Sequence, residues 1–345
     1  IASNDPKETM INMNDTNQIK ILSKATEMLF DKGQIHLPEF SNLISKSDDA
    51  SIELSYPSIK FPPSYNIILD IKKTKNRNIN ISILINEIKE TDDYFKENEN
   101  IDSVIIGSSV LSIKDSFYGC KSLKEVIISP KLNSIGENAF YGCSSLTRIS
   151  IPSSVSSIGK CAFFSCAYIK EIEIPFSLTE IKEQTFAHCI YLTNVVIPSS
   201  ISTLGEKSFC NCKSLKKISI PSSVEKIGDY TFSECESLNE VELLSSINTI
   251  PEGMFNLCSR LSSIVIPKSV TEIKAFAFRG CLQIKEMKIP SVNIIGAEVF
   301  KGCSSLIKIE LSSSLKIISS KAFYGCNKLQ QISIPSSVTS IESEA

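Results

Sequence analysis

Residues 151–175 read IPSSVSSIGKCAFFSCAYIKEIEIP, and the chain repeats this pattern along most of its 345 residues. A phenylalanine followed three residues later by a cysteine recurs at an interval of 23 residues, with a single interval of 22 before Cys303. A fixed period of this length indicates a solenoid, in which each repeat forms one coil and buries its apolar side against its neighbours. The ten cysteines of this cysteine ladder are Cys120, Cys143, Cys166, Cys189, Cys212, Cys235, Cys258, Cys281, Cys303 and Cys326.

Each repeat contains two kinds of apolar spacing. From Ile158 through Phe163 to Ile169 the apolar residues lie three or four apart, which predicts a short helical turn. The next residues alternate and end at Pro175, which predicts a short strand. Glycine often occupies the start of the predicted helical turn, where we expect it to adopt positive φ. These glycines are Gly136, Gly159, Gly205, Gly228 and Gly296.

The stretches at residues 135–152, 151–175 and 220–243 resemble the leucine-rich repeats of BspA-like surface proteins. The resemblance covers about Ile101 to Ala345. It implies an arc with a parallel sheet on its concave side and a role in adhesion or protein binding, often at the surface of a bacterium or an anaerobic protist. Together with the spacing, it predicts an α/β repeat solenoid with short helical turns on the convex side.

The expected organisation is an N-terminal region of uncertain mixed fold at residues 1–97 and a solenoid of about ten units at residues 98–345. The N-terminal pattern predicts a helix at 16–30 and strands at 67–71 and 79–85, which a basic turn connects. A polar stretch at 91–100 predicts a linker. The chain stops where the repeat requires another phenylalanine, so we expect a C-terminal truncation.

Composition and motifs argue against several function classes. Lys and Arg number 36 and Asp and Glu 38, so no global basic field favours nucleic acid. No apolar run approaches the roughly 18 residues of a membrane span. Phosphate-loop, nucleophile-elbow and zinc-helix motifs do not occur. Of the two histidines, we expect His188 to be a surface residue on a convex turn. The sequence therefore predicts a protein that is not an enzyme and has no cofactor, metal or catalytic residue.

The cysteine ladder has three interpretations at this point. Stacked free thiols that fill the interior are favoured, since cysteine behaves as a small apolar residue. Disulfides between neighbouring coils fit the expected spacing of about 5 Å but require an awkward dihedral angle. A metal–thiolate array is disfavoured because ligands in a straight row do not form a tetrahedron. Cys161 and Cys210 lie outside the ladder, and we expect them to be the more exposed thiols.

The outward-facing positions of the predicted strands are the candidate binding site. They mix both charges with isolated aliphatic residues and contain no aromatic residue. Nucleic acid prefers a basic stripe or stacking rings, so a protein partner fits best. The expected partner-binding residues are Arg148, Glu171, Glu173, Asn194, Lys217, Glu240, Glu242, Glu286 and Lys288.

Three hypotheses for function follow. The leading one is a non-enzymatic interaction or adhesion module at the cell surface or in the secreted fraction, with a host or matrix protein as one kind of partner. The alternatives are an intracellular, cytoplasmic scaffold and the binding part of a larger protein whose catalytic domain lies elsewhere. The oligomeric state is left open.

Overall fold

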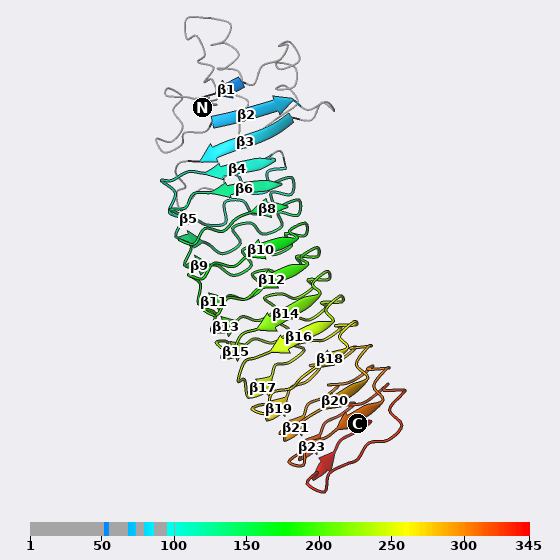
Figure 1. Cartoon of the computed structure of the whole chain (residues 1–345). Helices are drawn as coiled ribbons and strands as arrows, with labels where there is room; N and C mark the ends of the chain where they lie inside the picture. The colour runs from blue at the N-terminus through cyan, green and yellow to red at the C-terminus, as the bar shows by residue number, and fades with distance from the viewer. Residues whose placement is uncertain (1–51, 55–67, 74–78, 86–94, 100) are drawn as a thin grey trace, which may run out of the picture.

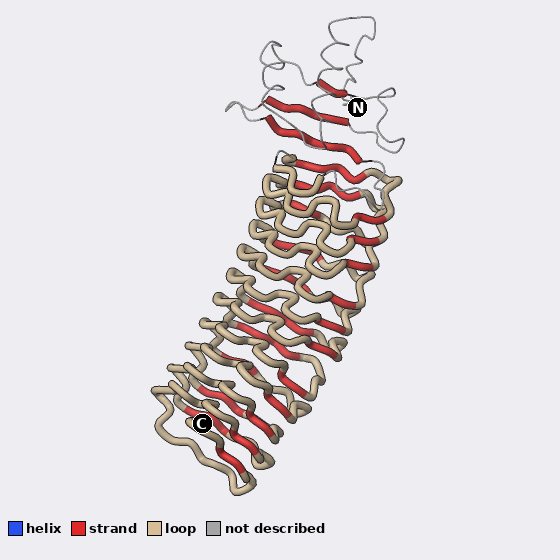
Figure 2. The backbone as a smooth tube through the Cα atoms, turned by 180° about the vertical axis from the view of Figure 1, so that it is seen from behind, coloured by secondary structure: helices blue, strands red, loops and turns tan. Residues whose placement is uncertain are grey.

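The computed structural model describes residues 52–54, 68–73, 79–85, 95–99 and 101–345. Residues 101–345 form an elongated, gently curved stack of coils (Figure 1). Strands and loops alternate throughout the described residues, and no helix occurs among them (Figure 2).

The first ladder of strands confirms the predicted parallel sheet. Paired neighbours are parallel and in register, as Glu171 with Asn194 and Glu173 with Val196. This arrangement follows from coils that all turn in the same sense, so that equivalent residues stack. The strands of the first ladder are β4 (Ser103–Ile106), β6 (Glu125–Ile128), β8 (Arg148–Ile149), β10 (Glu171–Glu173), β12 (Asn194–Val196), β14 (Lys217–Ile220), β16 (Glu240–Leu243), β18 (Ser263–Ile264), β20 (Glu286–Lys288) and β22 (Lys308–Glu310).

A second ladder of short parallel strands runs along another edge of the stack (Figure 1). The sequence analysis did not predict it, because it assigned Ile158 to a helical turn, whereas Ile158 ends a strand. The strands of the second ladder are β5 (Ser112–Ile113), β7 (Ser134–Ile135), β9 (Ser157–Ile158), β11 (Glu180–Ile181), β13 (Thr203–Leu204), β15 (Lys226–Ile227), β17 (Thr249–Ile250), β19 (Glu272–Ile273), β21 (Ile294–Ile295), β23 (Ile317–Ile318) and β24 (Ser340–Ile341).

The N-terminal strands extend the first ladder. Strands β1 (Ile52–Leu54), β2 (Ile68–Lys73) and β3 (Ile79–Ile85) pair antiparallel in chain order, and β3 then pairs parallel with β4. The two predicted strands at 67–71 and 79–85 are therefore confirmed. The predicted helix at 16–30 lies outside the described residues, as does the tip of the basic turn.

Stacked phenylalanine rings form the centre of the core. Ring centroids of consecutive coils lie 5.4–6.0 Å apart, and the ring planes are within 20° of parallel. The stack begins at Phe95, which is buried and packs on Phe117 at 5.6 Å. The linker prediction is thus wrong for Phe95, which contributes its ring to the solenoid core. Offset stacking of this kind adds to the burial of each large ring.

The prediction of helical turns is wrong. Some backbone N–H groups in these segments donate to carbonyls of the same coil, and others donate to carbonyls of the next coil. The Phe140 N–H donates to the Ala162 carbonyl of the next coil at 2.8 Å. The Cys143 N–H instead donates to the Phe140 carbonyl three residues earlier, at 3.1 Å. Left-handed φ angles at Asn138 (56°) and Gly142 (71°) interrupt any helix. The result is a series of tight turns that are hydrogen-bonded to the neighbouring coils.

The glycines at the start of these turns serve a different purpose from the one predicted. None of the five adopts positive φ. Instead, a Cβ atom on Gly159 would lie 2.3 Å from the backbone nitrogen of Glu137, on the preceding coil. These glycines therefore permit close approach of two backbones. Positive φ occurs later in the turn, for example at Gly142 and Ser165.

Candidate functional site

The exposed side of the first strand ladder is the candidate binding surface, and we call it the strand face. On β10, Glu171 and Glu173 are exposed and Ile172 is buried, because successive side chains on a strand point to opposite sides. The nine partner-binding residues predicted from the sequence all lie exposed on this face, on β8, β10, β12, β14, β16 and β20. Their role in binding stays a prediction.

Most charges on the strand face already have partners within the chain. Lys217 forms an ion pair with Glu240, and Arg148 lies 3.8 Å from Glu125. The Ser219 hydroxyl donates a hydrogen bond of 2.7 Å to Glu242. Exposed pairs of this kind contribute little to stability, since water screens them. They do reduce the charge that the face offers to a partner.

Glu171 and Glu173 differ from these charges. Neither carboxylate has an ion pair or side-chain hydrogen bond among the described residues. Their register neighbours on β12 are Asn194 and Val196, which are both uncharged. The neighbouring Lys170 is exposed and makes no ion pair either. These two carboxylates are therefore open to a partner.

Two tyrosines beside the strand face were missed by the sequence analysis, which considered only positions within the strands. Tyr168 and Tyr191 precede β10 and β12 by three residues and are 49% and 44% exposed. Their ring centroids lie 4.9 Å apart with planes tilted by 38°. The signal was present in the sequence, because the equivalent positions of the flanking repeats hold Ser145 and Ser214.

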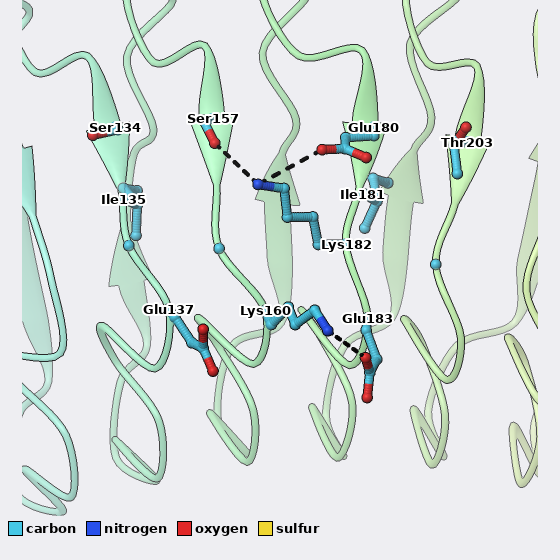
Figure 3. A pocket seen from close by; sticks show the side chains of 13 residues that line it. Ser134, Ile135, Glu137, Ser157, Lys160, Glu180, Ile181, Lys182, Glu183 and Thr203 are labelled. Carbon is cyan, nitrogen blue, oxygen red and sulfur yellow. Dashed lines mark hydrogen bonds and ion pairs between the residues drawn. The ribbon is translucent and has the colours of Figure 1, made fainter.

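A groove of about 580 Å³ lies over the second strand ladder, across β7, β9, β11 and β13 (Figure 3). Lys182 crosses it where the adjacent coils have glycine, with its Nζ atom 3.6 Å from Glu180 and 3.5 Å from the Ser157 hydroxyl. Lys160 contacts Glu183 at 3.0 Å. Both lysines are engaged by carboxylates of the same chain, and no aromatic ring lines the groove. We therefore assign it no ligand.

His188 lies on a turn, as predicted, but its side chain is only partly exposed. His188 is half-buried in a turn with φ of 61°, and its Nδ1 atom lies 2.7 Å from the Asn211 side-chain nitrogen. Its ring also packs against Phe164 at 4.8 Å. Burial lowers the imidazole pKa from its ordinary value of 6.5, which favours the neutral form of the ring. Among the described residues its side-chain hydrogen bond is to Asn211, and the Glu234 carboxylate acts on it only through the electric field.

The structure supports the free-thiol interpretation of the cysteine ladder. All twelve cysteines are unbridged, and the ten ladder members are buried. Each ladder thiol donates to a phenylalanine carbonyl of the preceding coil, as Cys143 to Phe117 at 3.1 Å. This bond gives the small buried side chain a polar contact that alanine would lack. Cys161 and Cys210 are only partly buried, as expected.

We expect chemical labelling to separate these two classes of thiol. Burial raises the pKa of Cys189 to about 12, and the pKa of the less buried Cys210 to about 11. Because the thiolate is the nucleophile, alkylation of native protein should modify Cys161 and Cys210 first. The rate at Cys210 should rise about tenfold per pH unit below its pKa. Mass spectrometry after alkylation without reductant measures both classes.

Denatured protein is the control for this experiment, since all twelve thiols should then react alike. Cross-linked neighbours in the ladder, or equal native rates at Cys189 and Cys210, would contradict the assignment.

The described residues offer no metal centre or membrane span. No group of three or more His, Cys, Asp or Glu side chains among them is arranged to hold a metal ion. None of the described residues forms a helix long and apolar enough to cross a bilayer.

Comparison with known proteins finds one family model that matches the chain. This model, BspA type leucine rich repeat region, matches in six copies over residues 86–207, 179–304 and 271–345. No match is found among curated proteins.

Several solved structures are similar to this chain. A leucine-rich repeat protein from Bacteroides ovatus is 23% identical, with a TM-score of 0.43, and covers 79% of this chain and 93% of its own. A leucine rich cell surface protein from Faecalibacterium prausnitzii is 24% identical, with a TM-score of 0.36 and coverage of 76% and 96%. The pneumococcal vaccine antigen PcpA is 18% identical, with a TM-score of 0.41 and coverage of 84% and 93%.

Proposed function

Because this chain belongs to the BspA-type leucine-rich repeat family, we propose that it is a non-enzymatic module that binds a protein partner through the strand face. Leucine-rich repeat arrays are typically protein-interaction modules, and their stacked strands present an extended surface. The face mixes both charges with exposed aliphatic side chains, such as Ile127 and Val196, at 53% and 70% exposure. Such a mixture suits a protein surface better than a nucleic acid.

The observation that carries this proposal is the open pair of carboxylates on β10. Among the described residues Glu171 and Glu173 face solvent without an ion pair or side-chain hydrogen bond, while most other charges on the face, such as Lys217 with Glu240, are paired within the chain. Charges at an interface mainly accelerate and orient association. An unpaired carboxylate keeps its full attraction for an incoming cation, which an intramolecular ion pair would weaken.

Charge reversal tests the proposal. The double variant Glu171→Lys with Glu173→Lys should slow association with a captured partner about tenfold at low salt, and less at high salt, because added ions screen the attraction. The probe is a panel of purified extracellular matrix proteins, with binding rates followed by surface plasmon resonance at two salt concentrations. Circular dichroism checks that the variant stays folded.

A double variant on the turns is the matched control, with the same change in charge. Glu206→Lys with Glu234→Lys should leave capture intact, since both residues lie on turns away from the strand face. If this control loses capture while the strand-face variant retains it, the binding surface lies on the turns and the proposal is wrong.

We also propose a cell-surface or secreted location, in keeping with an adhesion module that meets an external partner. Antibody labelling of intact source cells, compared with permeabilised cells, tests this location. Signal that appears only after permeabilisation would favour the cytoplasmic scaffold.

A further inference from the structure

We infer that the partner is held chiefly at one patch on the array and that it contributes an extended segment with a lysine or arginine between apolar side chains. The patch comprises Tyr168, Tyr191 and Val196 around the carboxylates of Glu171 and Glu173, and we call it the 168–196 patch. This inference rests on the proposed function and deepens it, because it names one site on the strand face and the chemistry of its partner.

Exposed aromatic side chains gather at this patch. Among the described residues, four aromatic side chains are more than a third exposed, and three of them lie between residues 168 and 191. Tyr168 and Tyr191 lie before strands β10 and β12, and Phe176, at 74% exposure, lies in the turn that leaves β10. Tyrosine is enriched among the residues that dominate binding energy. These exposed aromatic side chains provide the large apolar contacts for a partner that the strands themselves lack.

The two tyrosines are not needed to build the coils. Their backbone follows the pattern of the array, with the Tyr191 N–H donating to the Ala167 carbonyl at 3.0 Å. The flanking coils form the same turn with Ser145 and Ser214 at the equivalent position. A serine satisfies the fold there, so the two rings, paired at 4.9 Å, are additional apolar surface. Surface of this kind stabilises a complex when a partner covers it.

The charge of the patch selects a cationic side chain. Glu171 and Glu173 point out of the same strand and are unpaired. Arg148, on the preceding coil, is engaged by Glu125. An arginine or lysine placed over β10 therefore meets two carboxylates. The tyrosine pair, three residues before β10 and β12, offers apolar surface to the same bound segment. Lys170 is a second cation near the carboxylates, and it disfavours a further positive charge at that end of β10.

The shape of the patch suits an extended segment. Its width is two coils, or about 5 Å between strands, and its length runs from the turns that hold the tyrosines along β10 and β12. A single extended peptide, at about 3.3 Å per residue, fits such a narrow strip. Val196 and the tyrosine rings then receive its apolar side chains, and the carboxylates receive its cation.

Selection from a random peptide library tests this inference. The full chain is immobilised, and a phage-displayed library of random 12-residue peptides is the probe. Enriched peptides should carry Arg or Lys between apolar residues. Their affinity should fall at least tenfold for Tyr168→Ser with Tyr191→Ser, and at least tenfold for Glu171→Gln with Glu173→Gln. The serine variants copy the flanking coils, so the fold should persist, and circular dichroism checks this.

Tyr324→Ser is the matched control, because Tyr324 is similarly exposed, at 53%, on a distant coil. Its peptide affinity should be unchanged. Peptides that lose binding on Glu240→Lys with Glu242→Lys, but not on the tyrosine change, would overturn the patch and leave the proposed function standing. Peptides whose affinity is unchanged by every substitution on the strand face would overturn both the patch and the proposed function.

Three other results would also overturn the inference. Enrichment of acidic peptides would contradict the claim that the partner contributes a lysine or arginine. Failure to enrich any peptide would contradict the claim that the patch binds an extended segment. Dimerisation in sedimentation experiments that the tyrosine variants abolish would show that a second copy of this chain occupies the patch instead.

Discussion

Replacement of Phe209 by alanine is expected to lower the free energy of unfolding by about 3–5 kcal/mol. The ring is buried and stacks between Phe186 and Phe232 at centroid distances of 5.5 and 5.6 Å. Its removal leaves a cavity that the neighbouring rings do not close, because coil spacing holds them apart. Urea unfolding followed by circular dichroism measures the change.

Lys217→Ala on the same coil is the control for this substitution. Lys217 is exposed and pairs with Glu240 on the surface, so its loss should cost less than about 1 kcal/mol. Equal effects at the two positions would contradict the register of the core.

Substitution of Gly159 by alanine should cost about 3 kcal/mol or more, although only one methyl group is added. Its Cβ atom would lie 2.3 Å from the Glu137 nitrogen and 2.4 Å from the Gly136 carbonyl carbon. Both are backbone atoms of the preceding coil, which are held by interstrand hydrogen bonds and have little room to move. Thermal unfolding of the variant measures the loss.

Gly302→Ala is the matched comparison, because it separates steric contact from backbone strain. Gly302 has a φ of 75° but open space around its Cβ position. Ser165 and Asn211 adopt the same left-handed conformation at the equivalent turn position. We therefore expect a cost of only about 1 kcal/mol. A larger loss at Gly302 than at Gly159 would show that φ, and not close approach, explains the repeated glycine.

The core and the strand face were predicted well from the sequence because both depend on local patterns. Phe163 and Cys166 recur at an interval of 23 residues with one exception, and a side chain that recurs in every coil must stack on its equivalents. Alternation around Ile172 likewise placed Glu171 and Glu173 outward, and the structure shows both exposed. The neutralisation of Glu240 by Lys217 was not predicted, since the two residues are 23 positions apart and meet only through the stacking of coils.

The conformation of the turns could not be predicted from the local spacing of apolar residues. Apolar residues spaced by three and four fit a helix, but they equally fit successive tight turns that direct one side inward. Whether a helix or a series of tight turns forms depends on which carbonyl accepts the hydrogen bond of each backbone N–H. In this chain the Phe140 N–H bonds to Ala162 of the following coil. No feature of a single repeat reveals that acceptor.

The sequence by itself determined the period, the stacked core and the residues that the strands turn to solvent, because each follows from repetition and from alternation within one coil. The tertiary structure alone decided the tight turns, the close approach at Gly159, the half-burial of His188 and the open carboxylates beside the tyrosine pair. These features share one physical reason. Each depends on contacts between residues of different coils, and those contacts exist only after the coils have stacked.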